Sequence, residues 1–363
     1  MVRFFSQTSP ELLAGLFFLI GLVIGHQLIR WVIRLTPRTE RSPNPLPFKP
    51  SPLMHVPLLG SILSPKRCIY RGENIARKSL LTELGTGILF AGFTWMMMVH
   101  RCQFITEVRP DEISQYIRIL YHLILFTFLI AATGTDFRDY VIPDRVIVPG
   151  ILVAIIGATW SGDLQIVHLW VDANQEIPGL QAAYIPGWIA ENRHWHGLLV
   201  SLTGMMTGAG LTWLVRLVSS FFLGEETMGF GDVTLMAMIG AYLGWQPVLV
   251  VFLLAPFCGL FVAVLSRMIA GTAFIPYGPY LSAATVVVLF SWKWIWPFEV
   301  QIGTDEIISV RKIFGDLVGL GILIGIALTA LAVLLGLLRM YRTIPVSRPQ
   351  REVSENSTTK ESL

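Results

Sequence analysis

The chain has 363 residues, of which 53% are hydrophobic and only 14% are charged. A typical soluble domain carries about 25% charged residues, so the composition excludes an ordinary soluble protein. It predicts an all-α, polytopic integral membrane protein built as a helical bundle. The net charge of +3 is small, and its cations fall mainly in loops between apolar runs, so no nucleic-acid partner is expected.

Apolar runs of roughly membrane-spanning length recur along the chain. About 20 residues are needed to cross a hydrocarbon core of ~30 Å. No small-residue cleavage site follows the first run, Leu12–Ile33, so a retained helix is expected and not a signal peptide. We predict about 8–9 transmembrane helices, at 12–33, 84–100, 115–133, 145–160, 198–222, 231–245, 246–267, 278–298 and 315–338.

Glycines and methionines mark the short span 231–245. Small residues let membrane helices approach one another closely, so this span is expected to face other helices and not lipid. The whole chain divides into a first transmembrane helix at 1–34, a basic, Pro-rich cytoplasmic segment at 35–83, a membrane core at 84–298 with an extracytoplasmic insertion at about 161–196, an extra helical region at 299–340, and a disordered cytoplasmic tail at 341–363.

The distribution of Lys and Arg predicts the orientation, because positive residues in short loops stay in the cytoplasm. Segment 35–83 holds eight of them, whereas loop 161–196 has one arginine and four acidic residues. If successive spans cross the membrane in alternating directions from segment 35–83, the span that ends near 136 and the span that begins near 232 both meet the cytoplasmic face. The prediction is a multi-pass protein of the cytoplasmic membrane with its site facing the cytoplasm.

Two aspartates, Asp136 and Asp232, lie where apolar runs begin or end. A carboxylate there is costly to desolvate, so it marks a functional site by default. Two carboxylates a few ångströms apart cannot both ionise easily, so one keeps a proton while the other activates a water. The glycines before Asp232, Gly229 and Gly231, suit a close approach of the backbone. The pair therefore indicates an aspartyl protease.

Other readings stay open on the residues alone. Asp232 could cap its helix and Asp136 could pair with Arg138, while Asp139 and Asp144 are equally placed for capping. A proton-coupled transporter would also use intramembrane carboxylates, although nearer mid-span and on broken helices.

Four ordered stretches resemble the type IV prepilin peptidases, the bacterial GxGD aspartyl proteases. These stretches are His55–Gly60 running on to Thr82–Phe90, Asp136 with Ile142-Pro143-Asp144, Glu226–Val233 continuing to Trp245, and Ile275-Pro276-Tyr277-Gly278-Pro279-Tyr280-Leu281. Together they cover most of residues 12–298.

The resemblance implies a catalytic dyad of Asp136 and Asp232 that removes the leader of type IV prepilins or type II secretion pseudopilins. Proteolysis then needs no metal and no cofactor. Membrane lipids are the other expected partners, and oligomeric state is not predicted. The role of Glu83 stays open between a family function and a satisfied interfacial carboxylate. The supporting motif residues are Gly229, Gly231, Glu226, Pro143, Pro276, Gly278 and Pro279.

The chain departs from the family pattern in three ways. Many members carry two Cys-x-x-Cys pairs in the first cytoplasmic segment, a spacing suited to zinc, but here only Cys68 remains. A zinc ribbon is therefore not expected. Family members often methylate the new N-terminus with S-adenosylmethionine, which is expected here only if that activity is retained. Thr234 stands where lysine is common. These departures leave an inactive scaffold of the same fold as an alternative.

In loop 161–196, His194 and His196 form a His-x-His pattern among several tryptophans. A partner carboxylate at definite spacing is missing, so interfacial aromatic anchoring is favoured over a metal site.

Overall fold

The structure is a computed structural model. It describes residues 9–35, 57–58, 75–170, 172–176, 183–184, 187–223, 228–270, 276–302 and 306–316, with short helical pieces between 318 and 329.

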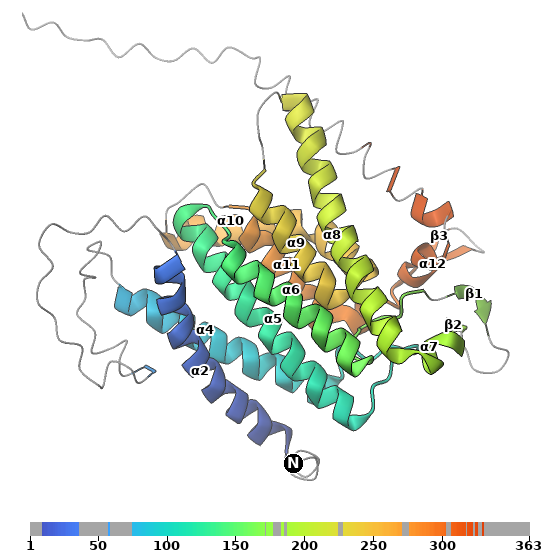
Figure 1. Cartoon of the computed structure of the whole chain (residues 1–363), viewed down its shortest axis with the longest axis horizontal. Coiled ribbons are helices and arrows are strands. Elements are labelled where there is room, and N and C mark those ends of the chain that lie inside the picture. The colour runs from blue at the N-terminus through green and yellow to red at the C-terminus, as the bar shows by residue number, and fades with distance from the viewer. Residues whose placement is uncertain are drawn as a thin grey trace, which may run out of the picture.

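The described residues form a bundle of long helices, drawn in Figure 1. One of these helices, α4, continues directly into a π-helical turn, η2. Two short helices, α7 (Gly187–Glu191) and α12 (Val310–Gly315), lie outside the main bundle. The long elements are α2 (Pro10–Leu35), α4 (Ile75–Trp95) with η2 (Met96–His100), α5 (Glu112–Asp139), α6 (Asp144–Ser161), α8 (Arg193–Leu223), α9 (Phe230–Leu243), α10 (Trp245–Ala270) and α11 (Gly278–Ile295).

The predicted fold class, a multi-pass helical membrane protein, is confirmed. In the described part of the chain, five helices are long and apolar enough to cross a membrane. Two shorter apolar helices, Phe230–Leu243 and Trp245–Gly259, accompany them. The five spans are Pro10–Leu35, Ser79–His100, Glu112–Asp139, Asp144–Ser161 and Arg193–Phe222.

Helix boundaries differ most at α4 and α5. Helix α4 begins at Ile75, nine residues before the predicted span, and α5 extends to Asp139. Hydropathy detects only the apolar centre of a span, whereas the helix continues through polar residues at its ends. Glu112 in the first turn of α5 and Arg138 in its last turn suit the helix dipole there. Most of 35–74, most of the ninth predicted span 315–338, and the tail lie outside the described residues.

Two small antiparallel strand pairs were not predicted. Strand β1 (Asp172–Glu176) pairs with β2 (Ala183–Tyr184), and β3 (Glu299–Ile302) pairs with β4 (Glu306–Ser309). Each strand has five residues or fewer, too short to give a clear alternating pattern. They leave the helical class of the protein unchanged.

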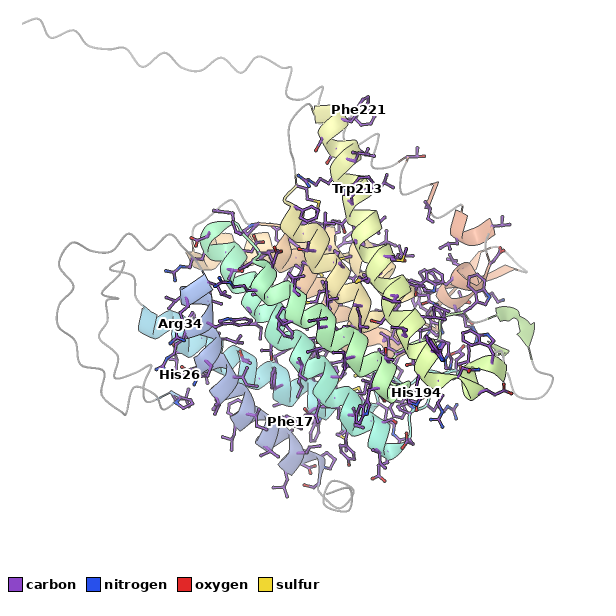
Figure 2. The ribbon with its side chains drawn as sticks, in the orientation of Figure 1. Phe17, His26, Arg34, His194, Trp213 and Phe221 are labelled. Atoms are coloured by element: carbon purple, nitrogen blue, oxygen red, sulfur yellow. The ribbon has the colours of Figure 1, made fainter. Side chains whose placement is uncertain are left out.

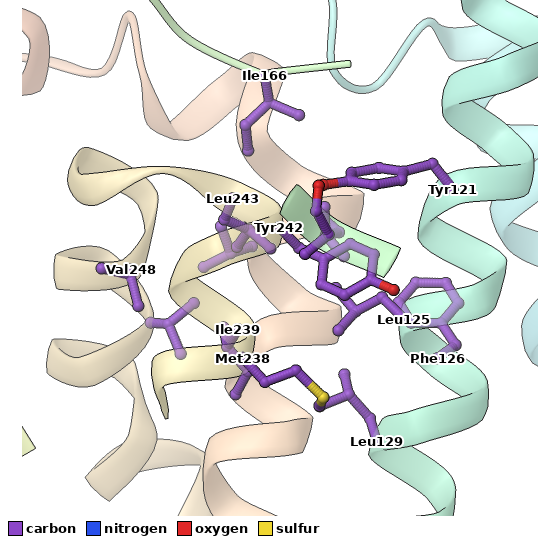
Figure 3. Close-up of a cluster of buried hydrophobic side chains, with 14 of the residues drawn as sticks. Tyr121, Leu125, Phe126, Leu129, Ile166, Met238, Ile239, Tyr242, Leu243 and Val248 are labelled. Carbon is purple, nitrogen blue, oxygen red and sulfur yellow. The ribbon is translucent and has the colours of Figure 1, made fainter. Parts of the chain in front are cut away.

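The core forms where α5 and α9 face one another. Figure 3 shows Tyr121, Leu125, Phe126 and Leu129 of α5 near side chains of α9. The rings of Tyr121 and Tyr242 lie 4.5 Å apart. From Val233 to Leu243 every residue of α9 except Thr234 is buried, which confirms the expectation that this helix faces other helices.

Helices α8 and α9 pack backbone against backbone. A Cβ atom added at Gly204 would collide with the carbonyl oxygen of Gly240, and one added at Gly208 would collide with that of Met236. Gly204 and Gly208 are four residues apart, so they form the small-residue stripe by which membrane helices approach closely. This contact fixes α9, and with it Asp232, against the rest of the bundle.

Substituting leucine for Gly208 is therefore expected to destabilise the protein by at least about 1–3 kcal/mol, the usual cost of overpacking. Thermal unfolding in detergent measures this as a lower midpoint. Gly210→Leu is the matched control, because an added Cβ at the exposed Gly210 meets nothing within 4 Å. Equal melting temperatures for the two variants would contradict the packing described.

The ends of the helices are easiest to follow in Figure 2, where Phe17, His26 and Arg34 mark successive positions along α2. His194 and Phe221 mark opposite ends of α8. The end of α5, the beginnings of α6 and α9, and the beginning of α11 meet at one end of the bundle, as the contacts described next show.

Candidate functional site

The first part of the site is the end of α5, where Asp136 lies in the last turn. The helix stops at Tyr140, which takes the left-handed conformation with φ of 56° and donates its backbone N–H to the carbonyl oxygen of Asp136 at 2.9 Å. This termination reverses the chain. Pro143 then precedes α6 as its N-cap residue. The left-handed Tyr140 and the N-cap residue Pro143 thus define the end of the helix that carries Asp136.

The second part is the beginning of α9. Gly229 is the N-cap residue, and Asp232 lies in the first turn. The hydroxyl of Thr234 donates to the carbonyl oxygen of Gly231 at 3.0 Å. The side chain at position 234 therefore bonds to the start of its own helix.

The third part is the beginning of α11. The backbone N–H of Gly278 donates to Oδ2 of Asp136 at 3.0 Å. A Cβ atom at position 278 would lie 2.5 Å from that same oxygen. Only glycine leaves room for this approach. Pro279 follows within the first turn of α11, where the missing N–H of proline costs nothing.

Ile142 joins the three parts. It is 7% exposed. A Cβ atom added at Gly231 would lie 3.1 Å from Cβ of Ile142. A Cβ atom added at Gly278 would lie 3.1 Å from Cδ1 of the same residue. The loop between α5 and α6 is therefore packed between the beginnings of α9 and α11. This packing brings residues from three distant motifs together.

The two aspartates lie in one electrostatic environment. Asp136 is 5% exposed and Asp232 is 8% exposed. The negative charge of Asp136 acts on Asp232. Burial, and then the charge of Asp232, raise the pKa of the neighbouring Tyr277 to about 12, so this phenol stays protonated near neutral pH. A tyrosine hydroxyl thus accompanies the carboxylate pair.

The structure does not support the alternative that Asp232 caps its helix or that Asp136 pairs with Arg138. The N-cap residue of α9 is Gly229 and not Asp232, and Asp139 is buried in the last turn of α5. In the described part of the chain, no ion pair joins Asp136 to Arg138. The observed hydrogen-bond partner of the Asp136 carboxylate is instead the N–H of Gly278.

Most of the predicted supporting residues surround this site. Gly229, Gly231, Pro143, Gly278 and Pro279 lie at the helix ends just described, and Pro276 lies two residues before α11. Glu226 falls outside the described residues. The bond from the Gly278 N–H, the role of Ile142 and the position of Tyr277 were not predicted. All three residues belong to the quoted motifs, but a motif does not say which atoms meet.

Glu83 is a satisfied buried carboxylate far along the chain from the dyad. It is completely buried and accepts hydrogen bonds from the backbone N–H of Leu58 at 2.7 Å and from the Ser79 hydroxyl at 3.0 Å. Its Oε1 also lies 2.7 Å from Nδ1 of His26 on α2. Of the two readings left open, these contacts favour a satisfied carboxylate, although it is fully buried and not interfacial. Glu83 ties residue 58 to α2 and α4.

Glu83→Ala is expected to lower the free energy of unfolding by about 3–5 kcal/mol. The substitution removes the carboxylate of a buried polar cluster and leaves the groups that bonded to it without that partner. Chemical unfolding in detergent checks this. The control is Glu112→Ala, exposed at the start of α5, for which a change below about 0.5 kcal/mol is expected. An unchanged free energy of unfolding for Glu83→Ala would refute the anchor.

The histidines of the 161–196 loop are engaged in local contacts. His196 Nε2 accepts from the N–H of Leu169 at 3.0 Å, and His194 Nδ1 lies 2.9 Å from the carbonyl oxygen of Thr159. The described residues contain no group of three or more His, Cys, Asp or Glu side chains suited to a metal ion. Cys68 lies outside them.

The fold and the site define a class: multi-pass helical membrane proteins with a buried pair of aspartates at one end of the bundle. Comparison with known proteins narrows the class. Residues 123–264 match the family model described as the Type IV leader peptidase family, and this stretch contains both aspartates. The predicted resemblance is confirmed: the chain is similar to proteins of the Type IV leader peptidase family.

Several curated proteins are similar over much of this chain. The Prepilin leader peptidase/N-methyltransferase of Klebsiella pneumoniae is 26% identical over 262 residues, covering 69% of this chain and 94% of the relative. The protein with the same name from Dickeya chrysanthemi is 25% identical over 314 residues, 77% of this chain and 93% of the relative. The Type 4 prepilin-like proteins leader peptide-processing enzyme of Escherichia coli is 26% identical over 238 residues, which are 65% of this chain and 70% of the relative. No solved structure matches.

Proposed function

We propose that the chain is a membrane-embedded aspartyl endopeptidase that removes the leader peptide of type IV prepilins or type II secretion pseudopilins. Asp136 and Asp232 are its catalytic dyad. The observation that carries this proposal is that two buried carboxylates, from helices far apart in the sequence, interact electrostatically at one end of the bundle, where Asp136 accepts the N–H of Gly278. The names of the similar proteins, one a prepilin leader peptidase and another a leader peptide-processing enzyme, support the substrate class.

The chemistry requires one proton shared by two carboxyl groups. The ionised aspartate takes a proton from a water molecule, whose oxygen attacks the scissile carbonyl carbon. The protonated aspartate donates its proton to the carbonyl oxygen, which gives a tetrahedral intermediate with two hydroxyl groups. The aspartate that took the proton from water then passes it to the leaving nitrogen, and the other aspartate takes a proton back from a hydroxyl group of the intermediate. The C–N bond breaks, and the new acid and the new amine are released. The N–H of Gly278 donates to Oδ2 of Asp136 and so holds this carboxyl group in one orientation.

The rival functions fit the geometry less well. A transporter carboxylate is expected near mid-span on a broken helix, whereas Asp136 lies in a last helical turn and Asp232 in a first one. An inactive scaffold has no need for a buried acidic pair, which is costly to keep. The hydrolytic function accounts for both the pair and its position.

The proposal extends to where the reaction takes place. We place residues 84–298 as the peptidase core, in a bacterial inner membrane, with the dyad at the cytoplasmic face. The positive residues of segment 35–83 support that orientation. N-methylation of the new terminus by S-adenosylmethionine is a separate activity, and the same experiment detects it.

The test is co-expression with a prepilin from the same genome, followed by intact-mass measurement of the pilin. Wild type is expected to remove the leader, and a further gain of about 14 Da marks methylation. A strain that lacks the chain gives the baseline. The function would be contradicted if every candidate prepilin of that genome kept its full mass when co-expressed with the wild-type chain.

Removal of metal ions is expected to leave cleavage unchanged, because two carboxyl groups supply both the base and the acid of the reaction. Initial rates in the presence and absence of EDTA check this. A rate that falls with EDTA and recovers with added zinc or magnesium would show metal-assisted hydrolysis instead.

A further inference from the structure

A groove of about 560 Å³ opens between α2, α4 and α5. Its walls are mainly apolar, with Leu28 and Val32 from α2, Leu81 from α4, and Ile130 and Phe137 from α5. Leu81 is 62% exposed and Phe137 is 46% exposed, so the groove is open on the outside of the bundle. All three helices are long and apolar enough to cross a membrane, so this outside faces lipid.

A cation lines the groove. Among the lining residues that the structure describes, Arg138 is the only charged one, and it lies at the end of α5. The Nε atom of Arg138 is buried and has no hydrogen-bond partner within the described part of the chain. A buried donor without a partner is costly, and a guanidinium binds phosphate oxygens well. The groove therefore offers an apolar channel with an anion site at its end.

The groove has a definite depth in the membrane. Its lining residues from α2 and α5 lie in the last third of each helix, and those from α4 lie near its beginning. They belong to the end of the bundle that also carries Asp136. The cation is thus at the level of the lipid headgroups, with apolar surface extending toward the membrane centre. Basic pockets between spans at this level suit anionic headgroups.

We propose that this groove is a binding site for one anionic phospholipid of the leaflet on that side. An acyl chain lies between α2 and α5 against Val32 and Ile130, and the phosphate accepts hydrogen bonds from Arg138. The site is distinct from the dyad. Gly134 and Phe137 line the groove, while Asp136 is directed to Gly278 on α11. The lipid fills the outer side of α5 and does not enter the reaction.

The test measures retained lipid by native mass spectrometry after release of the full chain from nanodiscs of equal parts phosphatidylglycerol and phosphatidylethanolamine. Wild type is expected to retain phosphatidylglycerol preferentially. Arg138→Gln should weaken that retention about fivefold, the effect of one cation near an anionic headgroup. The matched control is Arg145→Gln, which removes an exposed cation of α6 outside the groove and should change nothing.

A second variant tests the apolar part. Thr133→Phe fills the groove and is expected to reduce retention of both lipids, with its folding checked by thermal melting. Arg138→Gln carries the test alone if that variant does not fold. Equal retention of the two lipids by wild type, or equal losses from Arg138→Gln and Arg145→Gln, would overturn the proposal. So would a photo-crosslinker at position 133 that captures residues 36–74 or a pilin helix instead of lipid.

Discussion

Replacing either Asp136 or Asp232 with asparagine is expected to slow leader cleavage by about 10²–10⁴-fold, the usual contribution of a general acid or base. Asparagine keeps the size of the side chain but can neither take a proton from water nor hold one for the carbonyl. Initial rates with a purified prepilin measure the effect. Melting temperatures near that of wild type would show that the loss is chemical and not structural.

Asp139→Asn is the matched control for that prediction. Asp139 is a buried carboxylate three residues from Asp136, in the same last turn of α5. Neither of its carboxylate oxygens has a hydrogen-bond partner within the described part of the chain. Its variant is expected to cleave at close to the wild-type rate. If Asp139→Asn were as slow as Asp136→Asn, the assignment of the dyad would be wrong.

Gly278→Ala is expected to reduce cleavage about 100-fold, the cost of displacing a catalytic group by roughly 1 Å. The new methyl group would lie 2.5 Å from Oδ2 of Asp136, closer than van der Waals contact permits. The carboxylate must therefore move or lose the N–H that orients it. The rate with saturating prepilin should fall more than the affinity, because the change is at the reacting groups.

Gly210→Ala serves as the comparison for Gly278→Ala. An added Cβ at Gly210, in the middle of α8, meets nothing within 4 Å. Alanine there should stabilise the helix by about 0.5–1 kcal/mol and leave the rate unchanged. Wild-type cleavage by Gly278→Ala would mean that the contact between α11 and Asp136 is not needed for the reaction.

Much of the architecture was predictable because composition and hydropathy report directly on membrane spans. The runs at 12–33, 145–160 and 198–222 coincide closely with α2, α6 and α8. The short run at 231–245 was also predicted as a buried helix, since its glycines and methionines suit close packing. Boundaries were less accurate, because helices such as α5 continue beyond their apolar centre into turns that carry charges.

The site was predictable only in part. Two carboxylates at span ends, and the glycines around Asp232, indicated a pair and the residues that allow close approach. No spacing rule could show that the backbone of Gly278 donates to Asp136, since that bond joins residues 142 positions apart. The packing of Ile142 between two glycines is likewise a tertiary contact. Its sequence signal was only its place beside Pro143 in a recognisable motif.

The central claim is that Asp136 and Asp232 act as one catalytic unit, and a double substitution tests it most directly. Intact-mass measurement of prepilin incubated with purified wild type, each single asparagine variant and the Asp136→Asn, Asp232→Asn double variant gives four rates. The account predicts that the double variant is about as slow as either single one, because one group is useless without the other. Losses that multiply, or a single variant that cleaves at the wild-type rate, would contradict it.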